Sequence, residues 1–251
     1  GYYVEPISTL DFASLYPSIM IAHNLCYSTL VKNINEIDEL NENEDITNIK
    51  GKNNIKFVKN TVKKGVLPLI VEELIQARKK AKKLMAEEKN TVTKMVLNGR
   101  QLALKISANS VYGYTGASSG GQLPCLEVAT SITTLGRDMI EKTKEKVENY
   151  YNKNNGYEYN AIVIYGDTDS VMVKFGTKNI EEAMKLGKDA AKIISKEFIS
   201  PIKLEFEKVY CPYLLLNKKR YAGLLYTNPL NYDKMDCKGI ETVRRDFCIL
   251  I

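Results

Sequence analysis

Residues 161–175 constrain the fold more than any other part of the chain. Two β-branched, apolar runs flank a short polar centre, Gly166 to Asp169, and this pattern is typical of a tight β-hairpin. Side chains alternate along a strand, so Asp167 and Asp169 are expected to project the same way from the tip. Such carboxylates could hold Mg2+, which takes oxygen ligands. Asp and Gly are also ordinary turn residues, so the hairpin alone does not favour a metal site.

Further carboxylates lie on two other predicted strands. Residues 7–12 are expected to form a strand that ends at Asp11. A carboxylate at the end of a buried strand is a common position for a catalytic residue, although an Asp here could equally cap the helix that follows. A strand over residues 202–209 would carry Glu205 and Glu207 on one face, either near a metal site or simply in solvent.

The charge distribution is more informative than the composition. The 251 residues are 44% hydrophobic and carry a net charge of +6, which by itself identifies no partner. Between Thr61 and Arg100, however, ten cations accompany four anions, so one segment holds a surplus equal to that of the whole chain. Such clustering is typical of a surface for an anionic partner. A lysine-rich, solvated helix face would have the same composition.

This basic segment is predicted to be an αα-hairpin. Residues 65–90 and 92–111 show helical periodicity and are separated by a short turn at Asn90. Arg78 and Lys82 are four residues apart and therefore share a face of the first helix.

The second helix carries a stripe of a different kind. Lys105, Asn109 and Tyr112 follow one another at i, i+4 and i+7. A cation, an amide and an aromatic ring on one stripe suit a phosphate tail and a stacked base better than a dry core. A second hairpin over residues 214–225 has a basic turn next to an aromatic, which suits either phosphate groups or an exposed turn, at Lys218, Lys219, Arg220 and Tyr221.

The remaining segments set limits on the type of protein. Residues 33–60 are rich in Asn, Glu and Lys without periodicity, so a loop or partly disordered insertion is expected there. A loop is expected over 114–121, and amphipathic helices over 126–151 and 180–198. The five cysteines form no Cys-x-x-Cys pair and there is one histidine, which argues against a zinc site and favours a reducing compartment.

No apolar run approaches the ~18 residues of a membrane span, and there is no signal peptide, so we expect a soluble chain. The sequence starts with Gly1 and stops inside an apolar run at Ile251, so we also expect it to be a piece of a longer polypeptide.

Four motifs, taken in order along the chain, resemble the signature motifs of the family B DNA polymerases. They are Asp11-Phe-Ala-Ser-Leu-Tyr-Pro-Ser-Ile19, Lys105-x-x-x-Asn109-Ser110-x-Tyr112-Gly113, Tyr165-Gly-Asp-Thr-Asp-Ser170 and Lys218-Lys-Arg-Tyr221. The surrounding sequence is similar to the eukaryotic delta class of that family over residues 20–27, 97–105, 204–210 and 236–245. The resemblance covers nearly the whole chain apart from the Asn-rich stretch.

The resemblance implies an α+β fold, namely a polymerase palm of antiparallel β-sheet backed by helices, with an inserted two-helix fingers subdomain. The first part of the palm would be residues 1–60, with the Asn-rich insertion at about 33–60. The fingers would be 61–114 and the second part of the palm 115–240, and the thumb would begin at 241–251. The family's exonuclease would precede Gly1, and its cysteine-rich metal modules would come later.

The resemblance also assigns site residues. Asp11 and Asp169 would bridge two Mg2+ ions, with Asp167 as a weaker third acid, Glu205 and Glu207 as auxiliary acids, and no organic cofactor. The nucleotide would be bound by Ser14, Leu15, Tyr16, Arg78, Lys82, Lys105 and Asn109, and Tyr16 would exclude a ribose 2′-hydroxyl. Template and primer would be bound by Tyr112, Gly113, Lys218, Lys219, Arg220 and Tyr221.

The implied function is template-directed DNA synthesis in replication, in the nucleus, by a DNA-directed DNA polymerase. Its partners would be primer-template DNA, deoxynucleoside triphosphates and, through other parts of the protein, accessory subunits and a sliding clamp, with no membrane. Two alternatives remain at this point, a catalytically inactive DNA-binding scaffold and another two-metal enzyme such as a nuclease. Without its thumb this segment is expected to hold duplex poorly and need not be active alone.

Overall fold

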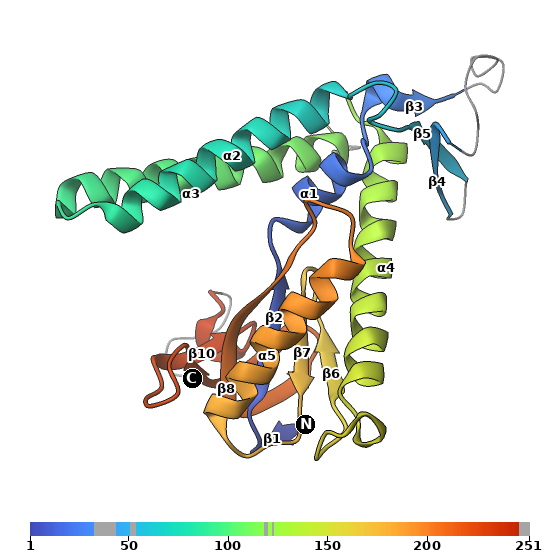
Figure 1. The fold of residues 1–251 in the computed structure, drawn as a ribbon. Coiled ribbons are helices and arrows are strands. Elements are labelled where there is room, and N and C mark those ends of the chain that lie inside the picture. The colour runs from blue at the N-terminus through green and yellow to red at the C-terminus, as the bar shows by residue number, and fades with distance from the viewer. Residues whose placement is uncertain (33–43, 51–53, 118–119, 122, 246–251) are drawn as a thin grey trace. The chain divides into compact units, whose positions relative to one another are not determined.

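The computed structural model describes residues 1–32, 44–50, 54–117, 120–121 and 123–245. The chain divides into two compact units, Gly1–Ala13 with Arg137–Ile251, and Ser14–Gly136 (Figure 1). Both combine helices with antiparallel sheets, so the α+β class predicted from the sequence is confirmed. None of the described helices combines the length and apolar character needed to cross a membrane.

The first unit is built on a seven-stranded antiparallel sheet with the order β10-β9-β8-β2-β7-β6, in which β1 also pairs with β8. The predicted hairpin over 161–175 is confirmed as β6 and β7. The predicted strand over 202–209 does not stop there, because it runs on into the second hairpin as one strand. The strands are β1 Tyr2–Tyr3, β2 Ile7–Phe12, β6 Ile162–Gly166, β7 Ser170–Lys174, β8 Leu204–Asn217, β9 Arg220–Tyr226 and β10 Lys234–Lys238.

One face of this sheet is covered by α5, Ile180–Ile194 (Figure 1). Ala183 and Met184 pack against Val209 of β8, and the buried Ser8 Oγ donates a hydrogen bond to the Ala183 carbonyl at 2.9 Å. A Cβ at Gly187 would lie 2.6 Å from the Phe206 ring, so glycine is needed for this close approach. The helix predicted to reach residue 198 ends at Ile194, followed by a 3-10 turn at Ser195–Glu197.

The opposite face holds an aromatic core. Neighbouring strand residues point to opposite faces, so Tyr210 turns away from α5 while Val209 faces it. Tyr210 and Tyr213 are fully buried and pack with Tyr221. This aromatic face supports the β8–β9 hairpin, whose basic turn the sequence singled out.

The second unit contains a helical hairpin, as predicted. In Figure 1 the helices α2, Val66–Glu87, and α3, Thr91–Thr115, run side by side. Asn90 caps α3, because its side chain accepts hydrogen bonds from two first-turn amides. The helix α3 extends past the predicted end at residue 111 into the segment expected to be a loop, and it accommodates Gly113 before it ends at Thr115. The unit also contains α1, Leu15–Ala22, and the start of α4, Leu126–Tyr150.

The prediction of a loop over residues 33–60 is wrong where the structure describes it. The strands β4, Ile46–Ile49, and β5, Ile55–Val58, pair with each other, and β5 also pairs with β3, Leu30–Val31. Short strands with many polar residues leave too few apolar positions for a visible two-residue period. Residues 33–43 and 51–53 of the predicted insertion lie outside the described residues.

Asn24 connects three elements of this unit. It is 1% exposed and has left-handed backbone geometry, with φ of 56°. Its Nδ2 donates to the carbonyls of Val58 and Lys63, both at 2.8 Å, and its Oδ1 accepts from the Gly65 amide at 2.8 Å. The end of α1, the end of β5 and the start of α2 are therefore tied to one side chain, which sets where α2 begins.

Candidate active site

Two aspartates that are distant in sequence, Asp11 and Asp169, lie next to each other in the backbone at one end of the sheet. In the strand register Asp11 of β2 lies opposite Ser170 of β7, and the Phe12 amide donates to the carbonyl of Asp169 at 2.8 Å. On its other side Asp11 lies opposite Glu205 of β8. Asp11 is half-buried, whereas the other two carboxylate residues are exposed. The sheet register therefore brings Asp11 next to Asp169, as the sequence motifs implied.

Asp167 at the hairpin tip is held by a lysine from the other hairpin. Its Oδ1 accepts from Lys219 Nζ at 2.6 Å and from the Thr168 amide at 2.8 Å. The backbone amide of Lys219 donates to Tyr165 Oη at 2.9 Å. Lys219 has φ of 63°, which is uncommon for a residue other than glycine. The β8–β9 turn is thus fastened to the tip of the β6–β7 hairpin by both backbone and side chain.

These contacts shift the pKa values of the two carboxylates of the tip in opposite directions. Desolvation, followed by the charge of Asp167, raises the pKa of Asp169 above its usual value. Burial also acts to raise the pKa of Asp167, but the hydrogen bonds and charge of Lys219, together with the Thr168 amide, outweigh it and lower that pKa. The hydrogen bond to Asp167 raises the pKa of Lys219 in return. Asp167 therefore stays ionised beside a cation, while Asp169 has no comparable partner among these groups.

The donor set fits a cation that substrate would help to bind. No group of three or more His, Cys, Asp or Glu side chains within the described ranges is arranged to hold a metal ion. Asp11 and Asp169 nevertheless supply two carboxylates at neighbouring strand ends, and Mg2+ is usually held by one or two carboxylates plus substrate phosphates. The auxiliary acids form ion pairs with neighbouring lysines, Glu205 with Lys203 at 3.0 Å and Glu207 with Lys208 at 3.4 Å.

The predicted template and primer residues of the second hairpin lie in three different environments. Lys218 is exposed. Arg220 forms an ion pair with Glu241. Tyr221 is 9% exposed and packs in the aromatic core, where burial, and then the charge of Asp167, raises its pKa to about 12. Contact of this turn with DNA remains a prediction.

In the second unit, Ser14 and Arg78 come together. Ser14 is the N-cap residue of α1 and has left-handed backbone geometry, with φ of 51°. Serine usually caps a helix with its hydroxyl, but this hydroxyl makes no cap hydrogen bond and instead accepts from Arg78 Nη1 at 3.2 Å. Leu15, the first residue of α1, is buried. The start of α1 thus presents a cation next to helix amides, an arrangement suited to an anion.

Two tyrosines form an aromatic pair in the same unit. The ring centroids of Tyr16 on α1 and Tyr112 on α3 are 4.4 Å apart. A Cβ on Gly136 would lie 3.4 Å from the Tyr16 ring, so glycine leaves space for that ring. Gly113, the next residue of α3, is exposed with open space around it. The sequence assigned both tyrosines to nucleotide or template binding, and the structure brings their rings together.

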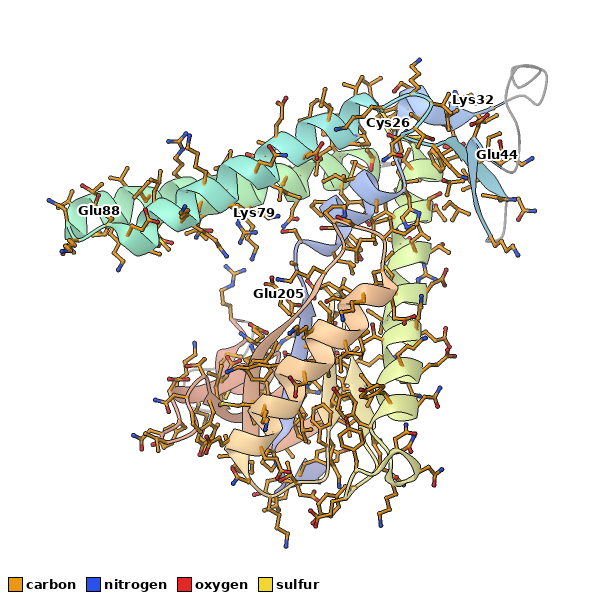
Figure 2. All side chains as sticks on the ribbon, viewed as in Figure 1. Cys26, Lys32, Glu44, Lys79, Glu88 and Glu205 are labelled. Atoms are coloured by element: carbon orange, nitrogen blue, oxygen red, sulfur yellow. The ribbon has the colours of Figure 1, made fainter. Side chains whose placement is uncertain are left out.

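The other predicted nucleotide-binding residues stay on exposed helix faces. Lys82 lies on α2, and Lys105 and Asn109 lie on α3; all three are exposed. No hydrogen bond or ion pair within the described residues joins them to Arg78. In Figure 2 the Lys79 side chain extends away from α2, and Glu88 lies at the turn between the two helices. The basic segment therefore forms a cationic surface on the helical hairpin.

One buried residue of this region, Gln101, is not among those predicted from the sequence. This side chain of α3 is 7% exposed and accepts a hydrogen bond from Arg78 Nε at 3.4 Å. Its position four residues before Lys105 was visible in the sequence, but a lone glutamine in a helix carries no functional signal. Only the packing of α3 against α2 showed that it meets Arg78.

Comparison with known proteins gives a consistent result over the whole chain. The family model described as DNA polymerase family B matches residues 1–251. The chain is 83% identical over 251 residues to the DNA polymerase delta catalytic subunit of Plasmodium falciparum (isolate K1 / Thailand). It is 62% identical to the protein of that name from Arabidopsis thaliana over 252 residues, and 61% to that from Drosophila melanogaster over 249 residues.

These alignments include 98% to 100% of the chain but only part of each relative. The chain spans 23% of the length of each of the three.

Proposed function

Because the chain belongs to DNA polymerase family B, we propose that it carries the nucleotidyl-transfer site of a DNA-directed DNA polymerase of the delta type. The reaction joins a deoxynucleoside triphosphate to a primer 3′-hydroxyl and releases pyrophosphate, with the template selecting the base. Since the chain spans 23% of the relatives' length, the activity belongs to the full-length protein that contains it.

The observation that carries this proposal is the meeting of Asp11 and Asp169 at neighbouring strand ends. These two carboxylates would hold two Mg2+ ions, and Asp167, Glu205 and Glu207 would add negative charge nearby. When bound, Mg2+ supplies positive charge that makes the primer hydroxyl a better nucleophile and stabilises the leaving pyrophosphate. No organic cofactor is needed for this chemistry.

The second unit supplies groups for the nucleotide. Arg78 has a planar guanidinium that binds phosphate oxygens in a fork, and the amides at Ser14 and Leu15 add neutral donors. Lys82 and Lys105 add positive charge from the exposed helix faces. Tyr16 would lie under the sugar, and Asn109 would line the new base pair.

The DNA-binding groups would act without reading sequence. Tyr112 and Gly113 would contact the template at the new base pair. Lys218, Lys219, Arg220 and Tyr221 would hold the primer-template duplex through its backbone and groove edges, which sets its position rather than its sequence.

The finer assignment of subdomains is part of the proposal. Residues 1–60 and 115–240 would form the palm, 61–114 the fingers and 241–251 the start of the thumb. Accessory subunits and a sliding clamp would bind other parts of the protein. With a replicative role, the protein would act in the nucleus.

The test is primer extension with the full-length protein. We expect template-directed, Mg2+-dependent incorporation that is lost in Asp11→Ala and in Asp169→Ala, by about 10³-fold or more. Asp138→Ala is a matched control, because Asp138 is an exposed carboxylate on α4 in the same unit as both acids. Extension that survives both active-site substitutions would contradict the proposal and favour a scaffold role.

A further inference from the structure

The buried amide of Gln101 has both of its ends in use. Its Oε1 accepts from Arg78 Nε at 3.4 Å, and its Nε2 donates to Asn98 Oδ1 at 3.0 Å. The residue is 7% exposed. A buried amide that lost one of these partners would be costly, so the bond to Asn98 fixes the amide with its oxygen toward Arg78.

Arg78 is thus held by two neutral acceptors from two different elements. Its Nε bonds to Gln101 on α3, and its Nη1 bonds to Ser14 at the start of α1 at 3.2 Å. A guanidinium carries five N–H donors, so these two bonds use only part of its capacity. Neither acceptor carries a negative charge, so these two contacts leave the positive charge of Arg78 unneutralised.

We propose that Gln101 is a positioning residue for nucleotide binding, which holds the guanidinium of Arg78 in the orientation that receives a nucleoside triphosphate. This inference rests on the proposed function, because it assumes that Arg78 binds the triphosphate. Both bonds are longer than the 2.9–3.0 Å that is most common for N–H donors. They orient the guanidinium without competing strongly with a charged phosphate.

The position of Gln101 on α3 supports this role. It lies one helical turn before Lys105, so the two side chains share one region of the helix surface. The exposed Lys105 supplies charge directly, whereas the buried Gln101 acts through Arg78. The helix α3 would thus contact the triphosphate through Lys105 and would orient Arg78 of α2 through Gln101.

The experiment uses the full-length protein with a primer-template whose next template base is dG and with dCTP as the nucleotide. We expect Gln101→Ala to raise KM for dCTP about tenfold, the size of losing a hydrogen bond to a charged group, while primer-template affinity stays unchanged. Gln101→Glu keeps an acceptor oxygen but places a negative charge beside Arg78, so it should also raise KM rather than recover the affinity. Gln76→Ala is the matched control, because Gln76 is an exposed glutamine on α2.

A double substitution separates positioning from a general effect on folding. If Gln101 acts through Arg78, then Gln101→Ala should add little to the defect of Arg78→Ala. Binding of dCTP to a complex with a dideoxy-terminated primer should weaken by the same factor as KM rises. Melting temperatures of all variants show whether the fold is retained.

Three results would overturn the inference: an unchanged KM in Gln101→Ala, defects that simply multiply in the double variant, or equal losses in Gln101→Ala and Gln76→Ala. The failure of the proposed function looks different, because the unsubstituted protein would then incorporate no nucleotide or Arg78→Ala would leave KM unchanged.

Discussion

The two candidate sites hold their key charged groups in opposite ways. At the hairpin tip, Asp167 is bonded to the oppositely charged Lys219 at 2.6 Å. In the second unit, Arg78 is bonded to the neutral Ser14 and Gln101 at 3.2 Å and 3.4 Å. A charged partner neutralises the group it holds and shifts its pKa, whereas a neutral partner orients the group and leaves its charge for a ligand. The difference suits Asp167 to a supporting role and Arg78 to direct binding of an anion.

Removal of Arg78 tests the comparison most strongly. Arg78→Ala should lower kcat/KM for the incoming deoxynucleotide about 10²-fold, or about 2.7 kcal/mol, because a phosphate-binding charge is lost. The kcat/KM of Arg78→Lys should lie between those of Arg78→Ala and the unsubstituted protein, since lysine keeps the charge but not the planar fork. Lys79→Ala, at an exposed lysine of the same helix, is the control. Equal defects at both positions would show that only the general charge of α2 matters.

The neutral aromatic pair should affect the choice between deoxyribonucleotides and ribonucleotides more than the affinity for the nucleotide. Tyr16→Ala removes one ring of the Tyr16–Tyr112 pair and should reduce the preference for deoxyribonucleotides over ribonucleotides about tenfold, because the steric barrier is lost. Tyr16→Phe keeps the ring and should keep the preference. Competition between dCTP and CTP in single-nucleotide incorporation measures it. An unchanged preference in Tyr16→Ala would remove the assigned role.

Another carboxylate, Asp236, accepts a hydrogen bond from a neutral donor inside the core. Tyr210 Oη donates to Asp236 Oδ2 at 2.6 Å, and both residues are buried. Tyr210→Phe should lower the free energy of unfolding by about 1 kcal/mol, because the carboxylate loses a buried donor. Tyr151 is the matched control, since its buried hydroxyl has no hydrogen-bond partner within the described residues.

Tyr151→Phe should leave the stability unchanged or slightly raise it. Denaturant unfolding of both variants gives the two values. Equal losses would mean that packing, and not the hydrogen bond to Asp236, sets the effect.

The ion pair of the hairpin tip should give the smallest effect and a pH dependence. Lys219 lowers the pKa of Asp167, so the pair stabilises the fold above the ordinary Asp pKa, and this contribution is lost as the pH falls through the lowered value. Lys219→Met should cost about 0.5 kcal/mol at pH 7, because the lysine side chain is 68% exposed and solvent screens the pair.

The stability difference between Lys219→Met and the unsubstituted protein should vanish once the pH is below the lowered pKa of Asp167. Unfolding measured from pH 7 downward tests this. A difference that stays constant with pH would assign the effect to the backbone of the turn, where the Lys219 amide bonds to Tyr165. The Lys218→Met variant, at an exposed neighbour, is the control.

Local patterns in the sequence predicted the elements that carry the sites. The spacing of apolar residues and the turn residues predicted two of these elements. They are the hairpin around Asp167 and the pair of helices that bears Arg78 and Lys105. The strands β4 and β5 were missed, because four-residue strands in a polar stretch show little periodicity. The continuation of β8 past residue 209 was missed because its middle, around Pro212, is typical of a strand end.

What the sequence determined by itself is the identity of the chemical groups and the elements on which they lie. Four ordered motifs, and the match of the whole chain to one family, require no coordinates. The pairing of Asp11 with Asp169 was already implied by the motifs, whereas the tertiary structure alone decided that Lys219 binds Asp167 and that Gln101 binds Arg78. Helices and turns follow from interactions between near neighbours in the chain, whereas strand register and helix packing depend on how distant segments fill one core.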